Sequence, residues 1–275
     1  MAPSTTITSG GWPVGGCCSS TGQYHGHDDR DRTTTICTSS GVAVGATGGQ
    51  VGVFDLSRPS TASRCHRVAL AAAGEADDHL MSAVVLGHMA FAPAFAGDSL
   101  QATALIEAAL PSAARESSLV RSWLHCVASE ARARAGDAAG SLREIELAEA
   151  TYVADDPMPQ WFDFYDLSRL QCFAGYAATV AGDRGLVVDR LARAADMLAG
   201  DDGAKQRSVI CADLAAASAD DGDQVAHHLR RAADALEVTW YGAGWDRVRQ
   251  TRTLLGDSRL GRQLDDRLAA LPGGG

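Results

Sequence analysis

A short signal that stops one helix and starts the next recurs along this chain, and it constrains the fold more than any other feature. It reads Ala-Gly-Asp at residues 96–98, 135–137 and 181–183, with Asp-Gly-Asp at 221–223 as a fourth copy. Glycine can take the left-handed backbone conformation that closes a helix, and the following aspartate can cap the next one. Because the glycines lie 39, 46 and 40 residues apart, the signal predicts a series of helix pairs.

Residues 160–199 are the clearest copy of the repeated unit. Apolar residues from Trp161 to Ala177 recur at spacings of three and four, which predicts a first helix with a broad buried stripe. After the turn at Gly182, a second apolar series of the same period runs from Leu186 to Leu198. Two helices joined so tightly leave an apolar flank on each outer side, so the pair needs neighbours that share its core.

The same periodicity predicts one partial helix and five helix pairs between Thr61 and Leu271. The expected bounds are Arg64–Ala76, Asp77–Phe95 with Ser99–Leu110, Ser117–Ala135 with Ala138–Tyr152, the pair of 160–199, Ala204–Ala219 with Gln224–Glu237, and Gly242–Leu255 with Arg259–Leu271. Pro111 is expected to end the first complete pair. The last pair carries a polar outer face, as a terminal repeat requires, at Arg247, Arg249, Arg252, Arg262, Asp265, Asp266 and Arg267. An ordinary helical bundle with similar turns is the alternative arrangement.

The spacing of small residues resembles that of the tetratricopeptide-type helical repeat. A small residue seven positions before the turn glycine marks the close helix crossing of that family, and here these positions hold Ala90, Ser129, Gly175 and Ala215. The alanine inside the second helix has counterparts in Ala102, Ala109, Ala148 and Ala194. The family's period is 34 residues, and these units are longer. The resemblance implies an all-α fold, a right-handed superhelix of antiparallel helix pairs known as an α-solenoid.

Residues 62–271 further resemble the C-terminal repeat region of actinobacterial Xre-type transcriptional regulators, in segments such as WFDFYDLSRL and AGYAATVAGD. In that family the repeats follow a helix-turn-helix DNA-binding domain, whereas the pattern of residues 1–60 predicts no helical pair that could act as one. The resemblance implies a non-enzymatic protein that binds a peptide or protein partner, like the sensor region of such a regulator. The alternative is a transcriptional regulator proper, whose helix-turn-helix is lost, encoded upstream or misread.

The chain divides into a leader at 1–60, a helical repeat domain at 61–271 and a glycine-rich tail at 272–275. The leader is rich in Gly, Ser and Thr without period, so we expect it to be disordered. It holds a weak zinc candidate, namely Cys17, Cys18, His25, His27 and Cys37, but lacks a C-x-x-C pair, and we expect no metal. The other cysteines, Cys65, Cys126, Cys172 and Cys211, fall one per helix, as free core thiols do in a reducing cytoplasm.

The resemblance places the first helix of each pair along a concave groove. Counting from the small residue of each unit puts these side chains near its wall: Val84, His88, Phe91, Trp123, Cys126, Glu130, Arg169, Cys172, Tyr176, Val209, Ala212 and Asp213. The candidates for contact with a peptide are His88, Phe91, Trp123, Glu130, Arg169, Tyr176 and Asp213, because apolar anchors supply affinity and charges fix register. Trp123 and Tyr176 can equally be core residues. For Arg169 a solvated ion pair with Asp166 is the favoured alternative.

Catalysis finds little support in the sequence. The carboxylate pairs, such as Asp155-Asp156 and Asp220-Asp221, lie at expected helix ends, where aspartate serves as a cap. His227-His228 falls on an expected exposed helix face, and the common nucleotide-binding, hydrolase and metalloprotease motifs are missing. The net charge of −10 argues against a nucleic-acid-binding surface. We therefore expect a cytoplasmic protein with no cofactor and no membrane contact, and we leave a homodimer open.

Overall fold

The computed structural model describes residues 59–157, 160–198, 200 and 203–271. Within these ranges the chain forms α-helices and short 3₁₀ turns and no strand, which confirms the all-α prediction. The helices are α2 (Pro59–Glu75), α3 (His79–Phe95), α4 (Ser99–Glu116), α5 (Ser118–Arg134), α6 (Ala138–Thr151), α7 (Leu167–Ala181), α8 (Arg184–Met197), α9 (Ala204–Ala217), α10 (Gly222–Val238), α11 (Gly242–Arg252) and α12 (Arg259–Ala269). The 3₁₀ turns are η2 (Gln160–Phe162) and η4 (Thr253–Leu255).

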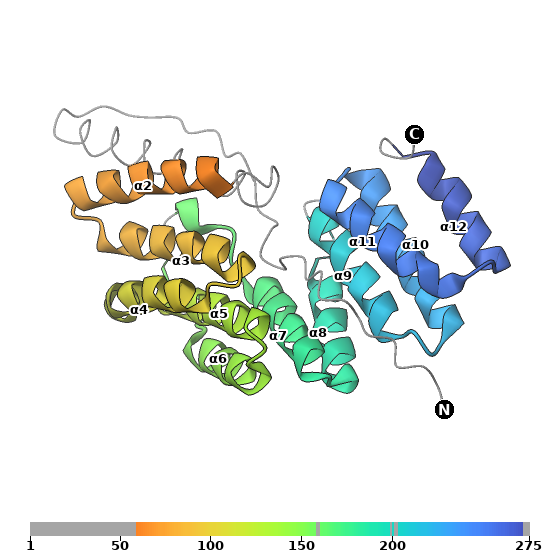
Figure 1. Ribbon diagram of the computed structural model, residues 1–275, viewed down its shortest axis with the longest axis horizontal. Helices are drawn as coiled ribbons and strands as arrows, with labels where there is room; N and C mark the ends of the chain where they lie inside the picture. The colour runs from red at the N-terminus through yellow and green to blue at the C-terminus, as the bar shows by residue number, and fades with distance from the viewer. Residues whose placement is uncertain (1–58, 158–159, 199, 201–202, 272–275) are drawn as a thin grey trace.

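Consecutive helices pack as pairs, and the pairs follow one another in chain order (Figure 1). The pairs are α3 with α4, α5 with α6, α7 with α8, and α9 with α10. First helices of successive pairs also touch, because α3 packs on α5, α5 on α7 and α9 on α11. The third and fourth pairs meet through α8 and α9. Figure 1 shows α2 to α6 on one side, α7 and α8 in the middle, and α9 to α12 on the other side.

Three of the four turn signals form the predicted geometry. Gly97, Gly136 and Gly182 have φ angles of 81°, 80° and 74°. The aspartate after each glycine caps the next helix: Asp98 accepts a hydrogen bond from the backbone N–H of Gln101, Asp137 from that of Gly140 and Asp183 from that of Leu186. These turns are therefore determined locally by three residues.

At the fourth signal the predicted cap was wrong by two residues. Asp221 rather than Asp223 is the N-cap of α10, and it accepts hydrogen bonds from the backbone N–H groups of Asp223 and Gln224. Gly222 is the first residue of α10 and does not have a positive φ. The reason is that α9 already ends at Ala217, and the turn after it closes with a hydrogen bond from Asp221 N to Ser218 O at 2.9 Å.

This difference predicts opposite effects of alanine at two glycines. No heavy atom lies within 4 Å of a Cβ built at Gly182 or at Gly222, so only the backbone matters. Gly182→Ala should lower the free energy of unfolding by about 1 kcal/mol, because alanine is strained at positive φ. Gly222→Ala should leave it unchanged or raise it by up to about 1 kcal/mol. Urea denaturation compares the two, and an equal loss in both would contradict the assignment.

The prediction that Pro111 ends the first helix pair was wrong. Helix α4 continues through it to Glu116, and Pro93 likewise lies inside α3. A proline inside a helix removes one backbone hydrogen bond. Ala113, beyond the proline, is fully buried in the core, and the helix end leads directly to Ser117, the N-cap of α5. Continued packing of α4 therefore outweighs the lost hydrogen bond.

The aromatic stretch before Leu167 is not part of the helix predicted for it. Residues 160–162 form η2, and α7 begins only at Leu167 because Asp166 is its N-cap. The Asp166 carboxylate accepts hydrogen bonds from the backbone N–H of Arg169 at 2.9 Å and from the hydroxyl of Ser168 at 2.5 Å. Phe162 and Tyr165 are nevertheless buried. The apolar periodicity thus runs through a connector that folds onto the core.

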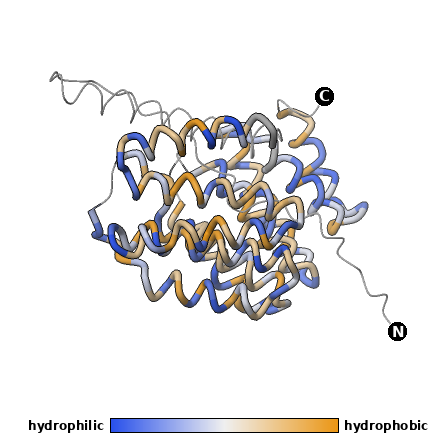
Figure 2. The backbone as a smooth tube through the Cα atoms, turned by 60° about the vertical axis from the view of Figure 1, so that its left-hand side comes forward, coloured by the Kyte–Doolittle hydropathy of each residue, from blue (hydrophilic) through white to orange (hydrophobic). Residues whose placement is uncertain are grey.

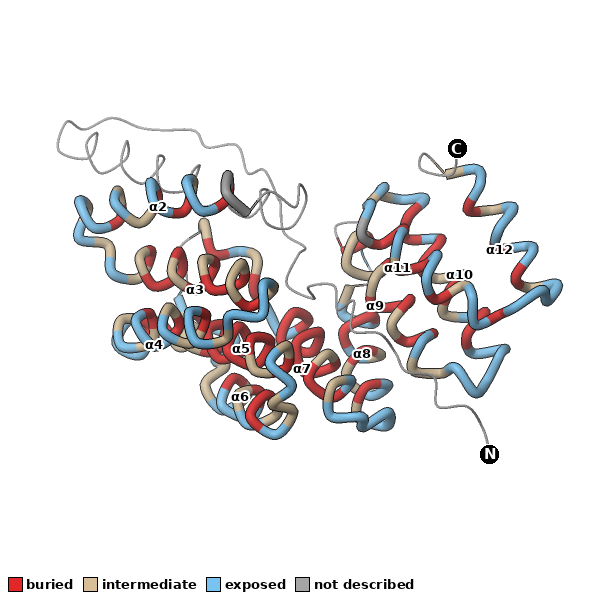
Figure 3. The backbone as a smooth tube through the Cα atoms, in the orientation of Figure 1, coloured by how far each residue is buried: buried red, intermediate tan, exposed pale blue. Residues whose placement is uncertain are grey.

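The core forms two large apolar clusters that meet at α7. One contains buried side chains of α3 to α7, and the other contains side chains of α7 to α12. Figure 3 shows that every helix from α3 to α10 carries buried positions, and Figure 2 shows hydrophobic residues interspersed with hydrophilic ones along the helices. A Cβ added at Gly175 would collide with the Leu191 side chain, so a larger residue at this close crossing of α7 and α8 would force Leu191 to move. The predicted alanines Ala102, Ala109, Ala148 and Ala194 are fully buried.

Arginines bridge successive pairs in the C-terminal half. Arg190 of α8 pairs with Glu149 of α6, Arg247 of α11 with Asp213 of α9, and Arg267 of α12 with Asp234 of α10 at 2.5 Å. Arg252 pairs with Asp265 at 2.6 Å. Of the residues predicted for the polar outer face, Arg247, Arg252 and Arg267 form ion pairs, because the planar guanidinium reaches the carboxylates of neighbouring helices.

The described cysteines are free thiols, with Cys126, Cys172 and Cys211 buried and Cys65 partly buried. Burial raises the pKa of Cys126 to about 12 and that of Cys211 to about 11. No described helix is both long enough and apolar enough to span a membrane. Helix α2 starts at Pro59, two residues before the predicted domain boundary. The predictions for residues 1–58, including the zinc candidates, and for the tail at 272–275 lie outside the described residues.

Candidate functional site

Six of the seven predicted peptide-contact residues separate into two groups in the structure, and Arg169 belongs to neither. His88, Phe91 and Trp123 lie among buried aromatic rings, with 4%, 2% and 3% of their surface exposed. Glu130, Tyr176 and Asp213 lie instead beside arginines of the first helices. Arg169 is buried near the start of α7, where its backbone N–H donates to Asp166.

The buried group is an aromatic cluster that joins α2, α3, α5 and the connector before α7. The ring centroid of His88 lies 4.7 Å from that of Trp123 and 5.1 Å from that of Phe164. Phe162 packs edge-on against Trp123 at 5.9 Å, and His66 of α2 stacks on His88 at 6.3 Å. His88 Nδ1 is 3.0 Å from Val84 O, whereas the buried Nε2 of His66 has no hydrogen-bond partner among the described residues. These rings pack together as a core.

The two cluster histidines predict a loss of stability in mild acid. Burial lowers the pKa of His66 to about 4, and burial together with nearby His66 lowers the pKa of His88 to about 3. An unfolded histidine takes up a proton below about pH 6.5, while both folded rings stay neutral, so acid favours unfolding. The free energy of unfolding should fall by up to about 1.4 kcal/mol per pH unit for each histidine below that pH. His66→Phe should reduce this slope in urea denaturation at pH 5–6.5, and an unchanged slope would contradict the assignment.

The second group forms what we call the aromatic-charged strip, consisting of Phe95 (α3), Glu130 and Arg134 (α5), Tyr176 (α7), Asp213 (α9) and Arg247 (α11). Five of the six residues lie on the first helices of the four pairs, and Arg247 lies on α11, which packs on α9. The Arg134 guanidinium carbon lies 4.2 Å from the centroid of the Phe95 ring and 5.7 Å from that of Tyr176. An arginine held between two aromatic faces keeps one orientation. The strip therefore presents a fixed charge between two rigid rings.

Glu130 is the buried ion-pair partner of Arg134 in the strip. Its side chain is fully buried, and one oxygen, Oε1, accepts hydrogen bonds from Arg134 Nε at 3.1 Å and Nη2 at 2.8 Å. Its other oxygen, Oε2, is buried without a hydrogen-bond partner among the described residues. Burial raises the pKa of Glu130, and the charge and hydrogen bonds of Arg134 oppose that rise. Glu130 thus holds Arg134 in place at the expense of a desolvated carboxylate.

Asp213 and Arg247 continue the strip towards the C-terminus. Arg247 donates from Nε to Asp213 and from Nη1 to Gln250 Oε1 at 3.1 Å. Burial raises the pKa of Asp213, and Arg247 opposes it. The pKa of Tyr176 is raised, mainly by burial; the charge of Arg134 opposes the rise, that of Glu130 adds to it, and that of Arg247 opposes it. Tyr176 therefore lies close enough to Arg134, Glu130 and Arg247 for their charges to act on it.

Sequence reasoning missed three members of the strip. Arg134 follows Glu130 by four residues, and this spacing on a helix is a signal that could have identified it. Phe95 is the last residue of α3, and Arg247 lies 34 residues after Asp213. The packing of α3 on α5 and of α9 on α11 brings them into place, and no local pattern encodes that contact.

One histidine-carboxylate pair also escaped the sequence analysis. His125 Nδ1 lies 2.9 Å from Glu144 Oε2, and Arg132 Nε donates to Glu144 Oε1 at 3.1 Å. The pKa of Glu144 is raised by burial and lowered overall by His125 and Arg132. Such a pair can orient a general base. Here, however, the side chains of His125 and Glu144 are only 9% and 15% exposed, and His125 Nε2 is buried without a partner among the described residues.

The described residues contain no group of three or more His, Cys, Asp or Glu side chains that could hold a metal ion. The arrangement best suited to contact another molecule is therefore the aromatic-charged strip, where half-buried rings and oriented charges reach the surface. No protein-family model matches the chain, and no curated protein sequence is significantly similar to it.

Proposed function

We propose that this protein is a non-enzymatic α-solenoid of the tetratricopeptide type that binds a peptide or protein partner along the aromatic-charged strip. In this proposal the helix pairs form a right-handed superhelix, and the first helices line its concave wall. The packing of α3 on α5, α5 on α7 and α9 on α11 supports it, because stacked helices of this kind form the wall of a helical-repeat protein. The two stacks are joined through α8 and α9. The resemblance of residues 62–271 to the sensor region of Xre-type regulators supports a regulatory role.

The observation that carries the proposal is that aromatic rings and ion pairs gather on α3, α5, α7, α9 and α11. Phe95, Arg134 and Tyr176 form one group on α3, α5 and α7, and Asp213 and Arg247 form an ion pair between α9 and α11. The side chains of Arg134, Asp213 and Arg247 are 12%, 20% and 24% exposed, so each is partly covered and still reachable. Partly desolvated tyrosine and arginine side chains are enriched among residues that dominate binding energy.

The strip suits a peptide that combines apolar side chains with charges of both signs. Phe95 and Tyr176 offer rigid surfaces for apolar anchors, and their few rotatable bonds limit the entropy lost on binding. The two ion pairs fix where a peptide carboxylate and a peptide cation can approach, which sets the register. The partner lies along the first helices and touches successive pairs.

The test is a selection of random peptides displayed on phage against the whole chain, followed by calorimetric titration of the enriched peptides. Tyr176→Ala should weaken their binding by about tenfold or more. The double variant Asp213→Asn/Arg247→Gln removes both charges while keeping both shapes, and it should also weaken binding. The matched control is Arg193→Gln, because Arg193 forms an exposed ion pair with Asp189 on α8, outside the strip. The proposal fails if no peptide is enriched, or if the strip variants bind as tightly as the control.

A further inference from the structure

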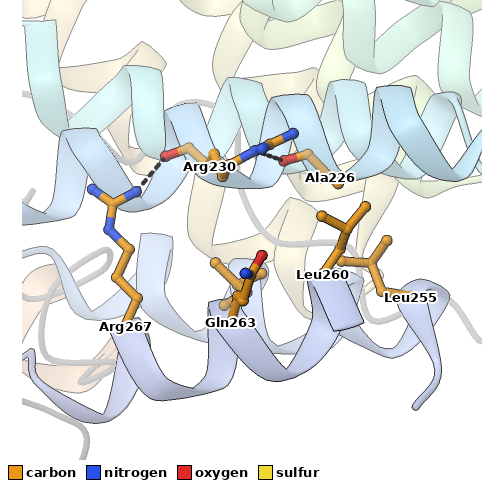
Figure 4. Close-up of a pocket in the computed structure, with 7 residues that line it drawn as sticks. Ala226, Arg230, Leu255, Leu260, Gln263 and Arg267 are labelled. Carbon is orange, nitrogen blue, oxygen red and sulfur yellow. Dashed lines mark hydrogen bonds between the residues drawn. The ribbon is translucent and has the colours of Figure 1, made fainter. Parts of the chain in front are cut away.

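A small cavity lies between α10 and α12, away from the aromatic-charged strip (Figure 4). Its volume is about 160 Å³. Ala226 of α10, Leu255 of η4, and Leu260 and Leu264 of α12 supply an apolar lining, and Arg230 and Arg267 flank it. Ala226 and Leu264 are buried, whereas Arg230 is exposed. The cavity therefore combines an apolar interior with cationic groups at its edge.

The two arginines differ in how far their charge is compensated. Arg267 pairs with Asp234 and Glu237 and also donates to Arg230 O at 3.4 Å. Arg230 donates only from Nε, to Ala226 O at 3.0 Å, and its terminal nitrogens have no partner within the described part of the chain. Figure 4 shows the Arg230 side chain lying along α10 beside Ala226, above the leucines. One uncompensated guanidinium thus borders the apolar cavity, and its paired donors match a carboxylate.

The volume limits the size of the occupant. Pockets for drug-sized ligands measure roughly 300–1,000 Å³, whereas an apolar cavity of about 150 Å³ in another protein holds a benzene molecule. The apolar part that fits here is accordingly a single ring or a short aliphatic chain. We propose that this cavity binds a small organic carboxylate, whose apolar part packs against Leu255, Leu260 and Leu264 and whose carboxylate accepts hydrogen bonds from Arg230. This site is separate from the peptide-binding strip and does not depend on it.

Hexanoate, titrated calorimetrically into the full chain, is the probe, and 1-hexanol and hexylamine are matched controls without the negative charge. Hexanoate should bind with a Kd on the order of 1 mM, as expected for so few atoms. Arg230→Gln should weaken hexanoate binding about tenfold and leave hexanol binding unchanged. Arg259→Gln, which removes an exposed arginine of α12 outside the cavity lining, should have no effect.

Filling the cavity supplies the second arm of the test. Ala226→Leu should abolish hexanoate binding, and its melting temperature shows whether the fold is retained. If Ala226→Leu unfolds the protein, Leu260→Trp serves as the second cavity-filling variant, because Leu260 lines the same cavity. The proposal is overturned if hexanoate does not bind, if hexylamine binds as tightly, or if neither Arg230→Gln nor the filled cavity weakens binding. These experiments test the cavity alone, because none of the residues that line it belongs to the aromatic-charged strip.

Discussion

Trp123→Ala should lower the free energy of unfolding by about 3–5 kcal/mol. Trp123 is 3% exposed, and its ring lies within 6 Å of the ring centroids of His88, Phe162 and Phe164. Removing it would leave a cavity where α3, α5 and the connector before α7 meet, because that core cannot close around so large a void. Urea denaturation followed by far-ultraviolet circular dichroism measures the change.

Trp240→Ala is the matched control, because Trp240 is 36% exposed in the connector between α10 and α11, with its ring centroid 5.4 Å from that of Trp245. Its loss should be on the order of 1 kcal/mol. Equal losses in the two variants would show that Trp123 is not the central core residue described above. If the Trp123→Ala protein stays stable and loses only peptide binding, Trp123 is a groove residue, the alternative that the sequence analysis left open.

Arg134→Met should cost about 3–5 kcal/mol at pH 7, because it leaves the buried Glu130 carboxylate without its partner. The loss should depend on pH. Burial raises the pKa of folded Glu130 above its ordinary value, so protonation favours the folded state and stability falls as pH rises above about 4.5. Without Arg134 the pKa rises further, and the fall between pH 5 and pH 7 should be steeper than in the wild type.

The double variant Glu130→Gln/Arg134→Met separates the charge from the packing. It should recover much of the stability lost in Arg134→Met, because no buried charge remains. Arg193→Met breaks the exposed pair with Asp189 and should change stability by no more than about 0.5 kcal/mol. If Arg134→Met is as mild as Arg193→Met, or if the double variant recovers nothing, the account of the Glu130 pair is wrong.

The sequence predicted the helix pairs well where three adjacent residues determine the turn, as at Gly97, Gly136 and Gly182. It failed where tertiary packing overrides a local signal. Pro111 lies inside α4 because Ala113 beyond it is buried. The residues before Leu167 keep a helical apolar period although they form a connector, because both arrangements bury their rings against the same core.

The candidate site shows the same division. Glu130, Tyr176 and Asp213 follow from counting along single helices, and Arg134 could have been added from its spacing of four residues. The contacts of Arg134 with Phe95 and of Arg247 with Asp213 join residues of different pairs. They depend on how first helices stack, which a pattern within one helix does not encode. Trp123 satisfied the same counting rule and lies in the core.

The stacking of first helices is the central claim, and nuclear Overhauser effects test it most directly. A Cβ added at Gly87 would lie 2.5 Å from Trp123 Cζ3, and one added at Gly244 would collide with Ser208. The first contact joins α3 to α5 and the second joins α11 to α9. We expect strong cross-peaks from the Gly87 α protons to the Trp123 ring and from the Gly244 α protons to the Ser208 β protons. If the helices form but either cross-peak is missing, the result contradicts the stacked arrangement on which the strip depends.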